Sequence, residues 1–178
     1  MEESSALALP SDLNAAPSAA AATSTAAALN AGRQHYAALS AVPSTLRITL
    51  AARAWGDSMF PRQAVGDTVA AKLLAAMGDD GRTWLQDKTS VYGILARTRY
   101  LRDLAHQFLR DHPGAQVVNL GCGLSHYFQW LDDGRARMID ADLPEVLALR
   151  AQILPPDNPR HRLCALDLSQ PDWCDTLG

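Results

Sequence analysis

Apolar and polar positions change their pattern near residue 43 and again near residue 113. From Thr45 onward, apolar residues recur at helical spacing in three stretches, 45–55, 61–77 and 91–111. After Gly114, short apolar strands at 116–120, 137–140 and 161–166 alternate with helical segments at 126–131 and 145–154. Such alternation is typical of a parallel sheet with helices on its faces. The pattern therefore predicts an α/β fold in which N-terminal helices precede three parallel strands.

The first 42 residues differ from the rest in composition. Ala, Ser, Pro and Thr dominate residues 1–42, and large apolar side chains are scarce there. A stretch that can bury so little apolar surface does not fold on its own. Glu2 and Glu3 stand where a secretory signal would carry basic residues. We therefore expect a disordered tail at 1–42 and a folded domain at 43–178.

Charge and cysteine usage exclude several classes of partner. The formal net charge of −3 provides no basic surface for nucleic acid. No apolar run approaches the roughly 18 residues of a membrane span. The three cysteines form no CxxC pair, and no histidine lies at zinc-ligand spacing from them. These features predict a cytoplasmic protein with no metal site and no nucleic-acid or membrane partner.

The candidate chemistry lies where the first two predicted strands end. The segment VVNLGCG (117–123) is an apolar strand that runs into a glycine-rich turn, and IDAD (139–142) is a second strand that ends in acid. Gly121 and Gly123 allow the backbone to approach a ligand closely. Asp140 and Asp142 can accept hydrogen bonds from ribose hydroxyls. The carboxyl ends of parallel strands meet at one edge, so the pair predicts a nucleotide-type cofactor site.

His126 bears on which cofactor this site would take. A dinucleotide fingerprint, GxGxxG, needs Gly or Ala at position 126 for close packing of helix on strand, and His126 is too large. The turn therefore favours S-adenosylmethionine over NAD and disfavours a dinucleotide-dependent oxidoreductase. The alternative is a glycine-rich turn in an unrelated α/β domain, which the acid at Asp142 makes less attractive.

Six segments, in this order and spacing, resemble the leucine carboxyl methyltransferase family. They are LAARA (50–54), DTVAAKL (67–73), ILARTRYLRD (94–103), VVNLGCGL (117–124), IDADLPEV (139–146) and ALDLSQPDW (165–173). The family includes protein-phosphatase methyltransferases and bacterial polyketide-type O-methyltransferases. The resemblance implies a Rossmann-like class I methyltransferase fold and S-adenosylmethionine as cofactor. It also implies an O- or carboxyl-methyltransferase that acts on a small-molecule hydroxyl or carboxylate.

Arg97 is the candidate for binding the amino-acid end of that cofactor. It shares a helical face with the apolar residues Ile94, Leu101, Leu104, Ala105 and Phe108, so we expect it to be buried. A buried guanidinium needs a partner, and its planar fork suits a carboxylate. An arginine at this distance before the glycine turn binds the cofactor carboxylate in the family. The alternative is an arginine that extends to solvent or pairs with an internal aspartate.

Asp167 and Leu168 follow the third predicted strand. The resemblance implies that they contact the adenine ring, with the carboxylate accepting a hydrogen bond from its amino group. The alternative is a turn, because Asp167, Ser169 and Pro171 cluster there. We assign no catalytic residue, because the cofactor carries an already activated methyl group and a carboxylate acceptor needs no general base.

The chain departs from the family pattern after the glycine turn and near its start. Ser125, His126 and Trp130 stand where most members have an acid, a small polar residue and an arginine. Ala52 stands where some members have a lysine that helps to hold the cofactor carboxylate. These departures favour the bacterial small-molecule branch over the phosphatase branch.

The chain ends at Gly178, soon after the third predicted strand, where family members continue with further strands and an acceptor pocket. We therefore expect a truncated domain whose first strand is an open sheet edge, free to self-associate. Two functions follow. One is methyl transfer; the other is that of a non-catalytic fragment that only binds the cofactor or a partner chain.

Overall fold

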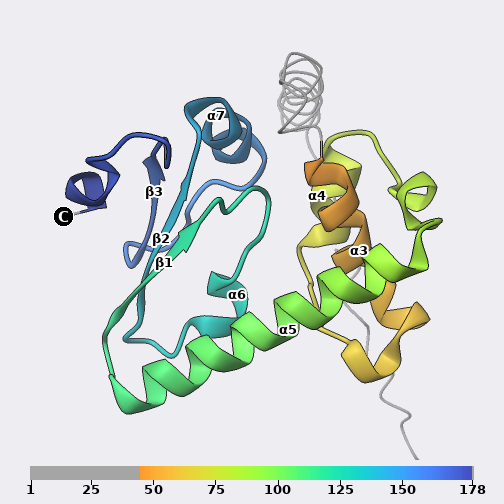
Figure 1. The fold of residues 1–178 in the computed structure, drawn as a ribbon, viewed down its shortest axis with the longest axis horizontal. Coiled ribbons are helices and arrows are strands. Elements are labelled where there is room, and N and C mark those ends of the chain that lie inside the picture. Colours follow the sequence, from red (N-terminus) through yellow and green to blue (C-terminus); the bar gives the residue numbers. More distant parts are fainter. Residues whose placement is uncertain (1–44, 178) are drawn as a thin grey trace, which may run out of the picture.

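The computed structural model describes residues 45–177, so the tail expected at 1–42 lies outside the described residues (Figure 1). The elements follow in the order α3 (Leu46–Met59), α4 (Ala70–Ala76), α5 (Lys88–Asp111), β1 (Gln116–Leu120), α6 (Phe128–Leu131), β2 (Arg137–Asp142), α7 (Pro144–Ile153) and β3 (His161–Ala165). Short 3₁₀ helices lie at Pro61–Gln63, Arg82–Leu85 and Trp173–Leu177. The predicted α/β fold, with helices before parallel strands, is confirmed.

The sheet has the strand order β1-β2-β3, and both pairs are parallel. Val118 of β1 lies opposite Ile139 of β2, which in turn lies opposite Arg162 of β3. The central strand is buried from Met138 to Ala141, as expected for a strand covered on both faces. The carboxyl ends of the strands therefore share one edge, as a Rossmann-like fold requires.

The long helix α5 connects the helical part of the molecule to the sheet (Figure 1). Val91, Ile94 and Leu95 in its first half pack in one cluster with Ala52 of α3. Near its other end, Leu109 packs with buried residues that include Met138 of β2. Asp87 begins the helix, because its carboxylate accepts hydrogen bonds from the N–H groups of residues 89 and 90. One continuous helix therefore packs against both α3 and the sheet.

The helix expected over 61–77 is interrupted, so this expectation is wrong. Gly66 has a φ of +63°, a left-handed conformation that ends helical geometry. Asp67 follows it, and its Oδ1 accepts hydrogen bonds from the N–H groups of Val69 and Ala70, both at 2.9 Å. Helix α4 consequently begins only at Ala70. The spacing of apolar residues across this segment fits a helix but does not reveal that the helix is interrupted at Gly66.

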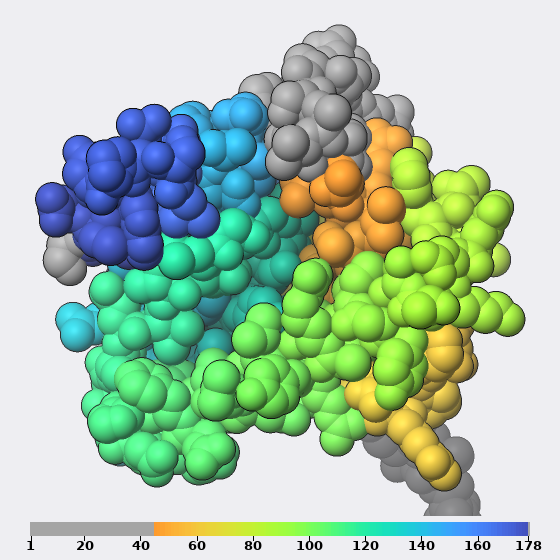
Figure 2. All heavy atoms as spheres, in the orientation of Figure 1, coloured from red at the N-terminus to blue at the C-terminus, as the bar shows by residue number. Residues whose placement is uncertain are grey.

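The buried face expected along α5 is correct only at its start. Ile94 is buried, whereas Leu101, Leu104 and Phe108 are 44%, 51% and 44% exposed. They lie instead beside β1, one of the two outer strands of the described sheet, and line an open groove with it. The space-filling view shows this face hollowed between α5 and the sheet (Figure 2). We call this hollow the edge groove.

Candidate functional site

The glycine turn, residues 121–125, leaves β1 with two left-handed residues. Gly121 and Gly123 have φ values of +64° and +52°, which side chains rarely adopt. A Cβ on Gly123 would also lie 2.7 Å from Cδ2 of Leu46. The turn is tied to β2, because the N–H of Cys122 donates to the carbonyl of Ala141 at 3.1 Å. The backbone conformation therefore favours glycine at both positions, and a Cβ at Gly123 would in addition require the Leu46 side chain to shift.

Asp142 faces the glycine turn from the end of β2. Its Oδ2 accepts a hydrogen bond from the N–H of Gly123 at 2.7 Å, and its Oδ1 accepts one from Leu143 N–H at 2.8 Å. A carboxylate offers about four lone-pair sites, so acceptor capacity is left on both oxygens. The structure thus brings together Asp142 and the glycine that the sequence analysis paired with it.

A cavity of about 310 Å³ opens at this end of the sheet. Its lining includes Gly121 and Gly123 from the turn, Arg97 from α5 and Arg53 from α3. We call it the turn cavity. The charge of Arg53 is paired with Asp67, so Arg97 is the cation that an anionic group could meet. A cation beside a glycine-rich backbone at the carboxyl end of a parallel strand suits an anionic group of a nucleotide-type ligand.

Arg97 reaches the turn cavity, although for a different reason from the expected one. Its side chain is exposed, so the argument from a buried helical face is wrong for this residue. The residues of α5 that pack in a cluster with Ala52 of α3 are Val91, Ile94 and Leu95, and Arg97 lies outside this cluster and lines the cavity. Arg99 points elsewhere, donates to the carbonyl of Arg62 and pairs with Asp103.

Asp140, the other acid of β2, is committed to an internal network and cannot serve a ribose. It is fully buried, pairs with the guanidinium of Arg150, and accepts hydrogen bonds from His161 Nε2 at 2.7 Å and Asn119 Nδ2 at 2.8 Å. Burial alone would raise the pKa of Asp140, but His161, Arg150 and Asn119 together hold it below its usual value. His161, on β3, is itself buried, with 3% of its surface exposed.

The groups around the turn cavity include no activated nucleophile among the described residues. Burial raises the pKa of the Cys122 thiol far above its usual value, so the thiol stays protonated and is a poor nucleophile. Burial likewise raises the pKa of Tyr127, whose hydroxyl lies 3.5 Å from the carbonyl of Thr98. The chemistry that these residues support is binding and positioning.

One cluster has the spacing of a metal site. Ligand atoms of His126, Asp140 and His161 lie within 4.8 Å of one another. The guanidinium of Arg150 already bonds the same oxygen of Asp140 that contacts His161, so a second cation would meet a buried positive charge. Burial lowers the pKa of His126, and Arg150 adds to the effect. We assign no metal to this cluster.

Comparison with known proteins supplies the family. The family model described as leucine carboxyl methyltransferase matches residues 23–178. The chain belongs to the leucine carboxyl methyltransferase family. Over 140 residues it is 34% identical to the tetracenomycin polyketide synthesis O-methyltransferase TcmP of Streptomyces glaucescens, a match that covers 78% of this chain and 51% of that protein. The chain thus spans about half the length of this curated relative. No solved structure matches the chain.

Two residues expected from the family pattern, Asp167 and Leu168, do not line the turn cavity. The carboxylate of Asp167 accepts hydrogen bonds from Ser169 N–H at 2.9 Å and from Gln170 Nε2 at 3.4 Å, contacts that belong to a turn. The bond to the backbone of Ser169 is the main cause of the lowered pKa of Asp167. Both residues nevertheless lie at the same sheet edge as Asp142, whose carbonyl accepts a hydrogen bond from Leu166 N–H at 2.8 Å.

Arg53 is a site residue that the sequence analysis missed. The family's early lysine was sought at Ala52, which is fully buried, whereas the neighbouring Arg53 lines the turn cavity. Arg53 pairs with Asp67 at 3.0 Å and donates to the carbonyl of Leu124 at 3.1 Å. Burial lowers the pKa of Arg53, and the charge of Asp67 opposes this effect. An arginine inside the apolar run LAARA, followed by an acid at Asp67 shortly before the next helix, was the available signal.

No helix of the described residues combines the length and the apolar character needed to cross a membrane. Even α5, which runs for 24 residues, carries arginines and aspartates along its length.

Proposed function

We propose that the chain binds S-adenosylmethionine and forms the cofactor-binding part of an enzyme that methylates an oxygen of a polyketide-type small molecule. Membership of the leucine carboxyl methyltransferase family and the similarity to TcmP, a tetracenomycin polyketide synthesis O-methyltransferase, support the proposal. The observation that carries it is the turn cavity, which Arg97, Gly121 and Gly123 line. Asp142 does not line this cavity but accepts a hydrogen bond from the N–H of Gly123 at its wall.

The residues present fit such a cofactor. The left-handed glycine backbone lets a ligand approach where side chains would stand in the way. Asp142 keeps free lone pairs for ribose hydroxyls, and the exposed guanidinium of Arg97 can bind a carboxylate. The volume of about 310 Å³ lies within the usual range of ligand pockets. We place Asp167 and Leu168 at the adenine end, beyond Asp142 on the same edge.

The bound cofactor would supply an activated methyl group, which is the difficult part of the chemistry. The residues of this chain would hold the carboxylate and the ribose, and so fix where the methyl group points. A carboxylate acceptor needs no base from the protein. The raised pKa values of Cys122 and Tyr127 keep both side chains neutral, which is consistent with a protein that positions the cofactor and supplies no base.

Calorimetric titration with S-adenosylhomocysteine and with NAD tests the proposal on the 178-residue chain. We expect binding of the first ligand only, and comparable or tighter binding of NAD would overturn the proposal. Arg97→Ala should weaken binding of S-adenosylhomocysteine by about 1.5 kcal/mol, the lower end for a hydrogen bond to a charged group, because Arg97 is exposed. Arg99→Ala is the matched control and should have little effect, since Arg99 lies outside the cavity.

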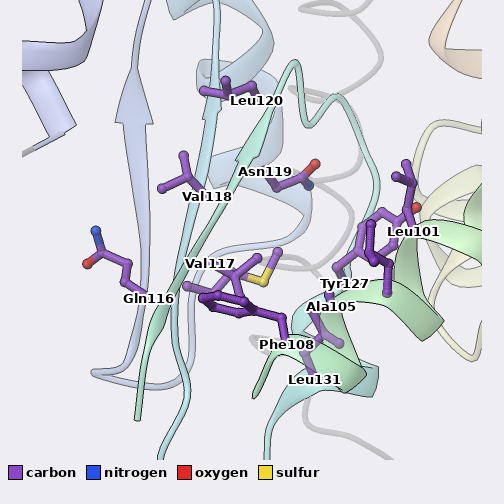
Figure 3. A pocket seen from close by; sticks show the side chains of 12 residues that line it. Leu101, Ala105, Phe108, Gln116, Val117, Val118, Asn119, Leu120, Tyr127 and Leu131 are labelled. Carbon is purple, nitrogen blue, oxygen red and sulfur yellow. The ribbon is translucent and has the colours of Figure 1, made fainter. Parts of the chain in front are cut away.

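A second proposal concerns association of the chain with itself. The edge groove, of about 580 Å³, is lined by Leu101, Ala105 and Phe108 of α5 and by Val117 and Asn119 of β1 (Figure 3). Residues 116–120 carry no charge or proline that would discourage strand pairing at the outer edge of the described sheet. We propose that two copies pair along β1 and cover each other's apolar groove.

Size-exclusion chromatography over a range of concentrations tests this pairing. The chain should elute as a dimer or a larger species at high concentration. Leu104→Lys should shift it toward the monomer, because Leu104 is exposed and lines the groove. Tyr100→Lys is the control, since Tyr100 is exposed on the same helix but does not line the groove. A wild-type chain that stays monomeric at every concentration would contradict the proposal.

A third proposal concerns the compartment and is based on the cysteines. Cys122, Cys164 and Cys174 are all free. Unpaired thiols suit a reducing environment, so we propose the cytoplasm. Non-reducing and reducing electrophoresis of protein isolated from its native source should give the same single band if this is correct.

A further inference from the structure

The carbonyl groups of three successive residues in the glycine turn are held by buried arginines. Arg150 Nη1 donates to the carbonyl of Gly123 at 3.1 Å and to that of Ser125 at 2.7 Å. Arg53 Nη2 donates to the carbonyl between them, that of Leu124, at 3.1 Å. The orientation of each of these peptide groups is therefore fixed by a charged donor, which forms a stronger hydrogen bond than a neutral one.

The two arginines differ in their access to a ligand. Arg53 lines the turn cavity, whereas Arg150 is fully buried in α7 and does not line it. A ligand in the cavity cannot touch Arg150. Any influence of Arg150 on such a ligand must act through the carbonyls of Gly123 and Ser125.

Arg150 is itself held in place by the strands. Its Nη2 bonds Asp140 of β2, and Asp140 also accepts hydrogen bonds from Asn119 of β1 and His161 of β3. Each strand of the described sheet thus contributes one side chain to the network that orients the guanidinium. The position of the turn relative to the sheet is consequently set by side chains that lie behind it.

The chemical identity of Arg150 matters because it serves three acceptors. A guanidinium offers five N–H groups in a rigid plane, whereas a lysine ammonium is a single point on a flexible stem. A buried ion pair is weak evidence for stability in itself, since apolar residues of the same volume often stabilise as well. The contacts to the turn therefore suggest a purpose beyond holding the fold together.

We infer that Arg150 is a positioning residue for the ligand turn, and that it fixes the peptide groups of Gly123–Ser125 in the orientation that ligand binding requires. The inference rests on the proposed function, because the ligand is taken to be S-adenosylmethionine. Preorganised peptide groups bind more tightly because the turn has less freedom to lose on binding.

The test compares Arg150→Lys with Val146→Ala in the 178-residue chain. Val146 is buried on the same helix, and the alanine variant removes packing without removing a contact to the turn. Affinity for S-adenosylhomocysteine is measured by calorimetry at a temperature where circular dichroism shows each variant folded. Arg150→Lys should raise Kd about tenfold or more, or about 1.4 kcal/mol. Val146→Ala should lower the melting temperature and leave Kd within about twofold of the wild-type value.

A second readout on the free protein does not depend on any ligand. The amide protons of Cys122, Gly123 and Ser125 are hydrogen-bonded, so their hydrogen exchange reports the order of the turn. Arg150→Lys should speed their exchange selectively relative to amides of the central strand, and Val146→Ala should not. If Arg150→Lys fails to fold, Arg150→Gln takes its place, because it removes the charge but keeps one donor group. It should then show the higher Kd and the faster exchange of the turn amides that are expected of the lysine variant.

The outcomes separate this inference from the proposed function. If wild-type protein does not bind S-adenosylhomocysteine, the proposed function fails, and the exchange measurement still decides whether Arg150 orders the turn. If wild-type protein binds and Arg150→Lys binds equally well, the inference is wrong while the proposed function stands. Unchanged exchange at the three turn amides would overturn the inference in either case.

Discussion

The two carboxylate oxygens of Asp67 have different partners: one pairs with Arg53 and the other caps the start of α4. Its Oδ2 accepts a hydrogen bond from Arg53 Nε at 3.0 Å, and its Oδ1 accepts bonds from the N–H groups of Val69 and Ala70. The side chains of Arg53 and Asp67 are only 3% and 2% exposed. Asp67→Asn removes the negative charge but keeps an oxygen that can still accept from Val69 N–H, Ala70 N–H and Gln129 Nε2, so the loss falls on the contact with Arg53.

The expected loss follows from the burial of Arg53. Breaking a buried ion pair by removing one partner costs about 3–5 kcal/mol, because the remaining charge lies uncompensated in a poorly polarisable environment. Asp67→Ala should cost about 0.5–2 kcal/mol more, the contribution of a lost cap. The double variant Arg53→Met/Asp67→Asn should recover most of the loss, because no unpaired charge remains.

Urea denaturation followed by circular dichroism measures these free energies of unfolding at neutral pH. The measurements are repeated at low and high salt, since salt screens a buried pair much less than an exposed one. A loss below about 1 kcal/mol for Asp67→Asn, the range of surface pairs, would refute the reasoning. A double variant no more stable than the single one would show that the unpaired charge is not the cause.

Two further predictions concern the turn and the network behind it. Asp140 has a lowered pKa in the folded state, so its stabilisation is present above the ordinary carboxyl pKa of about 3.9 and is lost as pH falls through the folded-state value. The difference in unfolding free energy between wild type and Asp140→Asn should therefore shrink below about pH 4, and a constant difference from pH 7 to about pH 2 would contradict the lowered pKa. Gly123→Ala should destabilise the chain by about 1–2 kcal/mol, because alanine is strained at a φ of +52°. Gly134→Ala is the control, at a φ of +82° with open space around it. It should lower the free energy of unfolding by a similar amount but leave the affinity for S-adenosylhomocysteine unchanged. Equal losses of affinity in the two variants would show that the glycine turn is not part of the site.

Local sequence determined the strands, the glycine turn and the acid at Asp142. Apolar runs between turn residues predicted β1, β2 and β3 to within two residues of their observed ends. The left-handed turn could be predicted because glycine at positions 121 and 123 suits a backbone that other residues avoid. The partnership of Asp142 with Gly123 followed as well, since parallel strands necessarily end at the same edge of the sheet.

Tertiary structure alone decided which side chains are buried and with which partners. The sequence pattern placed Arg97 and Phe108 on a buried face, yet both are exposed, because the burial of a helical face depends on what packs against it. It gave no sign that Arg150 and His161 would be buried around Asp140, since the three residues come from separate elements. Periodicity reports how residues are arranged along one element. Whether a charge is desolvated, and with which group it pairs, depends on atoms from other helices and strands. Those contacts exist only once the chain has folded.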